Sequence, residues 1–169
     1  MPYEIHAYCT SEKPPTIREL LTWLRDEENG WGLEADAPET GPKALDSARW
    51  TEFFLRYGRK GSQMQSLTLG CYRNTWPRSR CARMAQGQLE TVAEYNVSPG
   101  KKRVLDSLAR TRYIIWCRVD NDPDRARASP VLDLLASLLA RHGVVLDLED
   151  EGFLADSDTP LCGWCANDE

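Results

Sequence analysis

The chain has 169 residues, a net charge of −5 and no apolar run that approaches the roughly 18 residues of a membrane span. This length corresponds to about one domain, which buries a core that is stable without disulfides, so a membrane-spanning protein and a disulfide scaffold are both excluded. Because no basic segment followed by an apolar run opens the sequence, we expect a cytoplasmic protein. In that reducing compartment most of the six cysteines are expected to be buried thiols.

The charges are segregated along the chain. Residues 1–48 carry 4 basic and 10 acidic side chains, residues 49–118 carry 14 and 4, and residues 119–169 carry 3 and 12. A basic middle is therefore flanked by acidic ends. Blocks of opposite charge either face each other within a fold or form separate surfaces for separate partners, and the sequence leaves both alternatives open.

The first predicted element is a strand over residues 3–9, because side chains alternate there with a period of two. One face is apolar and is expected to be buried. The other face carries Glu4, His6 and Tyr8. These three side chains are candidates to line a site if that face of the sheet is open.

A helix is predicted from Thr16 to Asn29. Thr16 and Glu19 have the spacing of a capping box, apolar residues recur at helical spacing after them, and Asn29 with Gly30 provides a stop. Residues 31–48 are rich in turn-forming residues and have no sustained period. They are predicted to form a long surface connection.

Two antiparallel strands joined by a hairpin are predicted next, over residues 49–58 and 64–72. Both segments are rich in aromatic and aliphatic residues, and the segment between them is polar. Two helices are predicted to follow, the first over residues 81–96. The second is expected to run from Pro99 to about Thr111 with Ser98 as its N-cap.

The last predicted elements are an apolar strand over residues 113–119, a helix that starts at Ser129 and ends before Gly143, and a strand over residues 144–149. This order predicts an α+β protein, a single-domain two-layer sandwich with a ferredoxin-like βαββαβ core and an additional α-β at the C-terminal end. Helices would cover one face of the sheet, and the last strand would run parallel to residues 113–119. We assign residues 1–158 to this domain and residues 159–169 to a flexible tail.

The densest basic stretch lies where the second hairpin strand passes into the next helix. It consists of Arg73, Arg78, Arg80 and Arg83 around Trp76. Guanidinium groups match phosphate and carboxylate oxygens, and an exposed indole stacks on a base or on a guanidinium. These residues are the candidates for an anion or nucleic-acid contact; the alternative is a solvated loop that pairs with the acidic ends. The negative net charge argues against a dedicated nucleic-acid binder.

Cys162 and Cys165 have the C-x-x-C spacing of thiol-redox pairs and of zinc ligands. A redox pair needs a following helix to stabilise its thiolate, yet only four residues follow Cys165, and two of these are carboxylates. A zinc site needs a second pair, and Cys71 and Cys81 are ten positions apart. The two terminal cysteines are kept as redox or metal candidates, but no cofactor and no metal is expected.

The usual catalytic motifs are absent from the sequence. No serine lies in a G-x-S-x-G elbow, and neither a dinucleotide-binding glycine motif nor a complete phosphate loop occurs. We therefore expect a non-catalytic protein that binds a protein partner. The first alternative is anion or nucleic-acid binding through residues 73–83, and the second is thiol-redox or zinc chemistry at Cys162 and Cys165.

Overall fold

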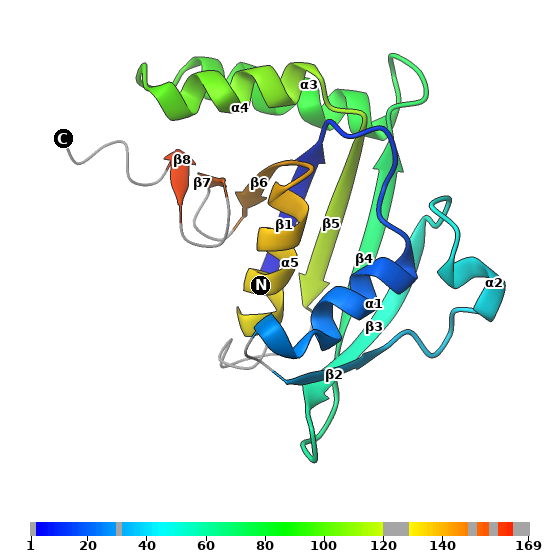
Figure 1. Cartoon of the computed structure of the whole chain (residues 1–169). Helices are drawn as coiled ribbons and strands as arrows, with labels where there is room; N and C mark the ends of the chain where they lie inside the picture. The colour runs from blue at the N-terminus through cyan, green and yellow to red at the C-terminus, as the bar shows by residue number, and fades with distance from the viewer. Residues whose placement is uncertain (1–2, 30–31, 120–128, 149–151, 156–158, 164–169) are drawn as a thin grey trace.

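The computed structural model describes residues 3–29, 32–119, 129–148, 152–155 and 159–163, which form an open antiparallel sheet with helices on both faces (Figure 1). The described strands follow the spatial order β2-β3-β4-β5-β1-β6-β7-β8. Their bounds are β1 Tyr3–Cys9, β2 Leu33–Asp36, β3 Glu52–Arg59, β4 Gln65–Arg73, β5 Tyr113–Val119, β6 Gly143–Asp147, β7 Gly152–Leu154 and β8 Pro160–Cys162. The helices are α1 Ile17–Arg25, α2 Pro42–Leu45, α3 Arg80–Ala93, α4 Pro99–Ala109 and α5 Ser129–Ala140.

The sheet has a separate apolar core on each face. Ile5, Ala7 and Cys9 of β1 pack into a core shared with α1 and α5. Tyr8 points to the other face and packs into a second core with residues of α3 and α4. Figure 1 shows α1 and α5 in front of the sheet, with α3 and α4 along its upper end. The prediction of a two-layer sandwich with helices on one face is therefore wrong.

The ferredoxin-like order of the strands is not confirmed. In that fold one antiparallel strand is inserted between the two parallel strands of each βαβ unit. Here two strands, β4 and β5, separate β3 from β1, because the α3–α4 hairpin returns the chain directly beside β4. A split βαβ unit is formed instead by β5, α5 and β6, because β1 lies between β5 and β6 in the sheet. Both strands are antiparallel to β1, so they run parallel to each other, as predicted for the last strand.

The first helix and the connection after it differ in part from the prediction. The capping box is present, since Thr16 Oγ1 accepts from Glu19 N at 3.1 Å and Glu19 Oε2 accepts from Thr16 N at 2.6 Å. The helix ends at Arg25, however, and a single 3₁₀ turn, Glu27–Asn29, follows. The predicted surface connection contains the edge strand β2 and the short helix α2. Two buried apolar residues in β2 are too few to show a period in the sequence.

The C-terminal strands β7 and β8 were not predicted. Phe153 of β7 and Cys162 of β8 are buried in the second core, and β8 packs against α4. Contact with α4 is close at Gly100, where a Cβ would lie 1.9 Å from the Leu161 carbonyl oxygen. Residues 160–162, which we assigned to the tail, therefore belong to the sheet.

Candidate anion-binding site

An open cleft of about 630 Å³ lies where β4 ends and α3 begins. We call it the arginine cleft. It is lined by Thr51, Cys71, Tyr72, Arg73, Thr75, Trp76, Arg78, Ser79, Arg80, Cys81 and Arg83. All five residues that the sequence singled out as an anion contact thus lie at one cleft. Its volume is in the range of ligand-binding pockets.

Local hydrogen bonds hold the loop between β4 and α3. Asn74 N donates to the Arg112 carbonyl at 2.8 Å, and Asn74 Nδ2 donates to the Thr111 carbonyl at 3.0 Å. Ser79 is the N-cap of α3, where its hydroxyl accepts from Ala82 N at 3.1 Å. These bonds direct the N-terminal end of α3 toward the cleft and give the loop a defined shape.

Two of the four arginines have structural contacts. Arg73 donates to the Trp50 carbonyl at 2.9 Å and also to the Ala48 carbonyl, so it holds the segment before β3. Arg80 lies over the Tyr72 ring, with its guanidinium carbon 4.2 Å from the ring centroid. Such cation–π contacts leave the N–H groups at the edge of the guanidinium available to a ligand.

The other two arginines and the tryptophan are exposed. The side chains of Arg78 and Arg83 form no hydrogen bond or ion pair with any described residue. Trp76 is 56% exposed, which is unusual for so large an apolar side chain. The prediction that these arginines pair with the acidic ends therefore has no support among the described residues.

The electrostatic arrangement at the cleft favours an anion. None of the lining residues is acidic, and the first turn of α3 contains no acidic side chain. Arg80 and Arg83 instead lie at the helix end that carries a partial positive charge. Cations are unfavourable at this position unless a negative group lies among them, and the free N–H groups of a helix start are themselves anion ligands.

A row of aromatic and cationic side chains continues from the cleft across the second face of the sheet. The Tyr72 and Trp116 ring centroids are 6.0 Å apart, and the Arg118 guanidinium carbon lies 5.7 Å from the Trp116 ring centroid. Burial raises the pKa of Tyr72, and the nearby Arg80 guanidinium opposes that effect. The Tyr72 hydroxyl is therefore neutral near neutral pH and adds no negative charge to the cleft.

The three candidates on β1 have two different environments. Glu4 and His6 form a close pair with Oε1 and Nε2 2.6 Å apart, and they lie opposite Arg118 and Trp116 of β5. Tyr8 is 1% exposed, and burial raises its pKa. It packs in the second core against Phe153, with ring centroids 6.1 Å apart. Tyr8 is therefore a core residue, and the three side chains do not form one site.

Cys162 lies in β8 with a free thiol, and Cys165 is outside the described residues. Burial raises the pKa of the Cys162 thiol, although Lys101 partly opposes this. A reactive cysteine needs the opposite shift, because the thiolate is the nucleophile. Among the residues that the structure describes, no group of three or more His, Cys, Asp or Glu side chains is placed to hold a metal ion.

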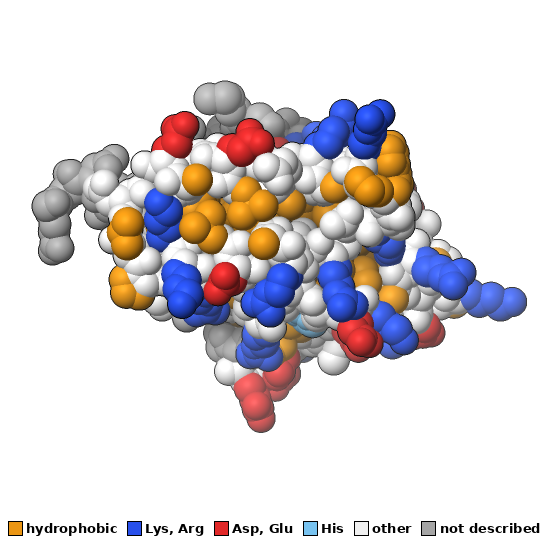
Figure 2. All heavy atoms as spheres, turned by 90° about the horizontal axis from the view of Figure 1, so that it is seen from above, with side chains coloured by type: hydrophobic (Ala, Val, Ile, Leu, Met, Phe, Trp, Pro, Cys, Tyr) orange, Lys and Arg blue, Asp and Glu red, His pale blue; other side chains and the backbone are white. Residues whose placement is uncertain are grey.

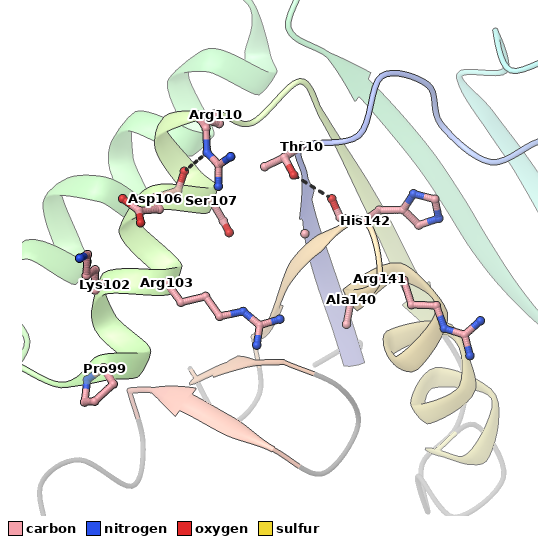
Figure 3. A pocket seen from close by; sticks show the side chains of 11 residues that line it. Thr10, Pro99, Lys102, Arg103, Asp106, Ser107, Arg110, Ala140, Arg141 and His142 are labelled. Carbon is pink, nitrogen blue, oxygen red and sulfur yellow. Dashed lines mark hydrogen bonds between the residues drawn. The ribbon is translucent and has the colours of Figure 1, made fainter.

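A second groove, which the sequence did not indicate, lies between α4 and the turn from α5 to β6 (Figure 3). We call it the α4 groove. It has a volume of about 450 Å³ and is lined by Thr10, Pro99, Lys102, Arg103, Asp106, Ser107, Arg110, Ala140, Arg141, His142 and Gly143. The lining residues of α4 recur every three or four positions and so share one helical face. This spacing of polar and charged residues in 99–110 is the sequence signal from which the groove could have been predicted.

A Ser–His contact lies beside this groove. The Ser11 hydroxyl is 3.0 Å from His142 Nδ1 and 2.5 Å from the Tyr113 hydroxyl, which also donates to the Lys13 carbonyl at 3.1 Å. Burial, opposed by Glu19, lowers the pKa of His142. The imidazole ring points away from the α4 groove in Figure 3. These hydrogen bonds connect the segment after β1 to the turn after α5. We assign no catalytic role to them.

Comparisons with the models of known families, with curated proteins and with solved structures find no match. No helix among the described residues is both long and apolar enough to span a membrane. The geometry of the two grooves is therefore the basis on which a function is proposed.

Proposed function

We propose that the protein is a non-catalytic binding protein whose arginine cleft receives the carboxylates of an acidic protein partner. The observation that carries this proposal is the convergence of four arginines and the exposed Trp76 on one cleft without an acidic lining residue. Guanidinium groups bind carboxylates through paired hydrogen bonds, and arginine and tryptophan are the residues that dominate the energetics of protein interfaces.

The surface beside the cleft supports a protein partner. Met84, Leu89, Tyr95 and Leu105 of the α3–α4 layer are only partly buried. Figure 2 shows this layer from above, where a band of apolar side chains crosses the surface, with mostly Lys and Arg side chains along its lower side and both acidic and basic side chains along its upper side. An apolar band with a basic side is complementary to a segment that carries both apolar and acidic residues.

Nucleic acid is the second candidate, because Trp76 and the arginines also suit a base and its phosphates. The charge distribution favours the protein partner. The acidic segments 1–48 and 119–169 repel a long polyanion, whereas a short acidic segment needs only the local positive charge.

Fluorescence anisotropy with labelled peptides tests the proposal. The probes are a synthetic peptide of alternating Glu and Leu residues and an oligothymidylate of similar length. We expect the peptide to bind the wild-type protein more tightly than the oligonucleotide does. Replacing Arg78 and Arg83 together by alanine should weaken peptide binding by about tenfold or more, because charge-assisted hydrogen bonds are lost.

The matched control is the double substitution of Lys43 and Lys60 by alanine, which removes the same charge from exposed positions outside the cleft. It should change peptide affinity by less than about twofold at about 0.15 M salt, where charges farther apart than the Debye length are screened. An equal loss in both double variants would contradict a site at the cleft. Tighter binding of the oligonucleotide that depends on Arg78 and Arg83 would replace the protein partner by nucleic acid.

A further inference from the structure

We propose that the α4 groove is a second binding site, for a compact oxyanion of the phosphate class, with the Ser107 hydroxyl and the guanidinium groups of Arg103 and Arg110 as its ligands. The α4 groove and the arginine cleft have no lining residue in common. The second site therefore does not depend on the function proposed for the cleft.

Ser107 is the residue that points to a ligand. Its side chain is 8% exposed and lines the groove, and its hydroxyl makes no hydrogen bond with any described residue. The carbonyl of the same residue is already bonded, since it accepts from the Thr111 hydroxyl at 3.0 Å. Figure 3 shows the Ser107 hydroxyl directed into the groove. The hydroxyl therefore faces the groove and is available to donate a hydrogen bond to a ligand there.

Two guanidinium groups lie on either side of this hydroxyl. Arg103, Ser107 and Arg110 are four and then three positions apart, so they lie along one face of α4. Arg110 Nε donates to the Asp106 carbonyl at 3.1 Å, which orients the guanidinium and leaves its two terminal nitrogens free. The Arg103 side chain has no hydrogen bond or ion pair with a described residue, and in Figure 3 it extends across the groove. The planar guanidinium fork matches the oxygens of a phosphate group.

The remaining charged residues of the groove leave this centre positive. The Asp106 carboxylate and the Lys102 ammonium belong to the same lining, although in Figure 3 they lie farther from the α5–β6 turn than the Arg103 guanidinium does. On the opposite wall, Arg141 stacks over Trp23, with its guanidinium carbon 4.1 Å from the ring centroid. The His142 carbonyl accepts from Thr10 N at 2.7 Å and from Thr10 Oγ1 at 3.2 Å, so it is occupied. Four basic side chains and one carboxylate therefore line the groove, so the described lining carries a net positive charge.

Isothermal titration with inorganic pyrophosphate tests the site on the full chain. We expect saturable binding that weakens when the salt concentration rises from about 0.05 M to about 0.2 M. Arg103→Ala should weaken it by about tenfold or more, and Ser107→Ala by about threefold to tenfold, since each variant removes a donor to the anion. Two variants should each have less than about twofold effect: Lys43→Ala, which removes a positive charge from an exposed position outside both grooves, and the Arg78→Ala, Arg83→Ala double variant.

Three outcomes would overturn the proposal: no saturable binding, equal losses in Arg103→Ala and Lys43→Ala, or loss of binding in the double variant. The last would assign the anion to the arginine cleft. Failure of the acidic peptide to bind would leave this titration unaffected, so the two proposals fail separately. Titration with adenosine triphosphate identifies the form of the ligand: similar affinity indicates the terminal phosphate of a small molecule, and weaker affinity indicates the free anion.

Discussion

At the scale of single residues, Gly70 shows how a small side chain positions a large one. Gly70 lies in the middle of β4, opposite Trp116 of β5, and a Cβ at this position would lie 2.1 Å from Cε2 of the Trp116 ring. A glycine within a strand often marks such a close approach. The space at Gly70 allows the indole to lie flat on the sheet, between Tyr72 and Arg118.

Gly70→Ala is therefore expected to destabilise the protein by about 1–3 kcal/mol, because the rigid indole has to leave its position. Urea unfolding measures the change. The control is Gly87→Ala on α3, where a Cβ meets no atom within 4 Å. That variant should stabilise the protein by about 0.5–1 kcal/mol, since alanine is the better helix former. A Gly70→Ala variant as stable as the wild-type protein would show that the contact with Trp116 is unimportant.

Residue patterns predicted one groove and not the other. Five candidates in residues 73–83 lie at one cleft because they are close in sequence, so a short loop was sufficient to bring them together. The α4 groove needs α4 and the α5–β6 turn to meet, and this contact depends on the tertiary fold. The alternation along β1 predicts on which face of the sheet Tyr8 lies. It does not predict which part of that face is covered by a helix, and Tyr8 lies in a covered part.

At the scale of secondary structure, the helix starts were predictable because capping is local chemistry. The Thr16–Glu19 capping box and the Ser98–Pro99 start are both present, and Ser98 Oγ accepts from Lys101 N at 3.0 Å. The strands β2, β7 and β8 were missed because they have only three or four residues each. Segments of this length are too short to show an alternation of apolar and polar residues. They form strands because the edge of a sheet that already exists supplies their hydrogen bonds.

Thr16→Ala should lower the free energy of unfolding by about 1 kcal/mol, because Glu19 N loses its acceptor and the capping box is broken. Thr22→Ala on the exposed side of the same helix is the matched control. Its hydroxyl donates to the Arg18 carbonyl at 2.8 Å within the helix, so alanine should be neutral or slightly stabilising there. Equal destabilisation by both substitutions would contradict a specific role of the cap.

At the scale of the whole molecule, the structure bears on a question that the sequence left open. Arg56–Asp36 joins the basic middle of the chain to its acidic N-terminal part, with nitrogen and oxygen 2.7 Å apart. Arg78, Arg83 and Arg103 pair with no described carboxylate. Of the 14 basic side chains in residues 49–118, seven line the arginine cleft or the α4 groove. Composition gives the amount of charge in each segment, but the surface on which it lies depends on the fold.

The buried thiols predict a loss of stability at alkaline pH. Burial raises the pKa of Cys71 to about 11 and that of Cys81 to about 12, and it also raises the pKa values of Cys9 and Cys117. In the unfolded chain a thiol ionises near pH 8.5. Above that pH the unfolded state binds fewer protons than the folded state, so stability falls as the pH rises, by about 1.4 kcal/mol per pH unit for each thiol.

Urea unfolding of the reduced protein between about pH 8 and pH 10 measures this slope. Cys71→Ala should make the slope shallower by the contribution of one thiol, whatever the substitution does to stability at pH 8. An unchanged slope in that variant would show that Cys71 ionises equally in both states.

The position of β1 also has a consequence for how the protein is made. β1 is synthesised before both strands that flank it, since Cys9 at its end pairs with Tyr113 on one side and with Gly143 on the other. The nascent chain therefore carries this apolar strand without its neighbours until residues 113–147 have been synthesised. Folding of the sheet then depends on contacts between distant parts of the chain, which makes it slow and leaves β1 as a segment that chaperones are expected to bind.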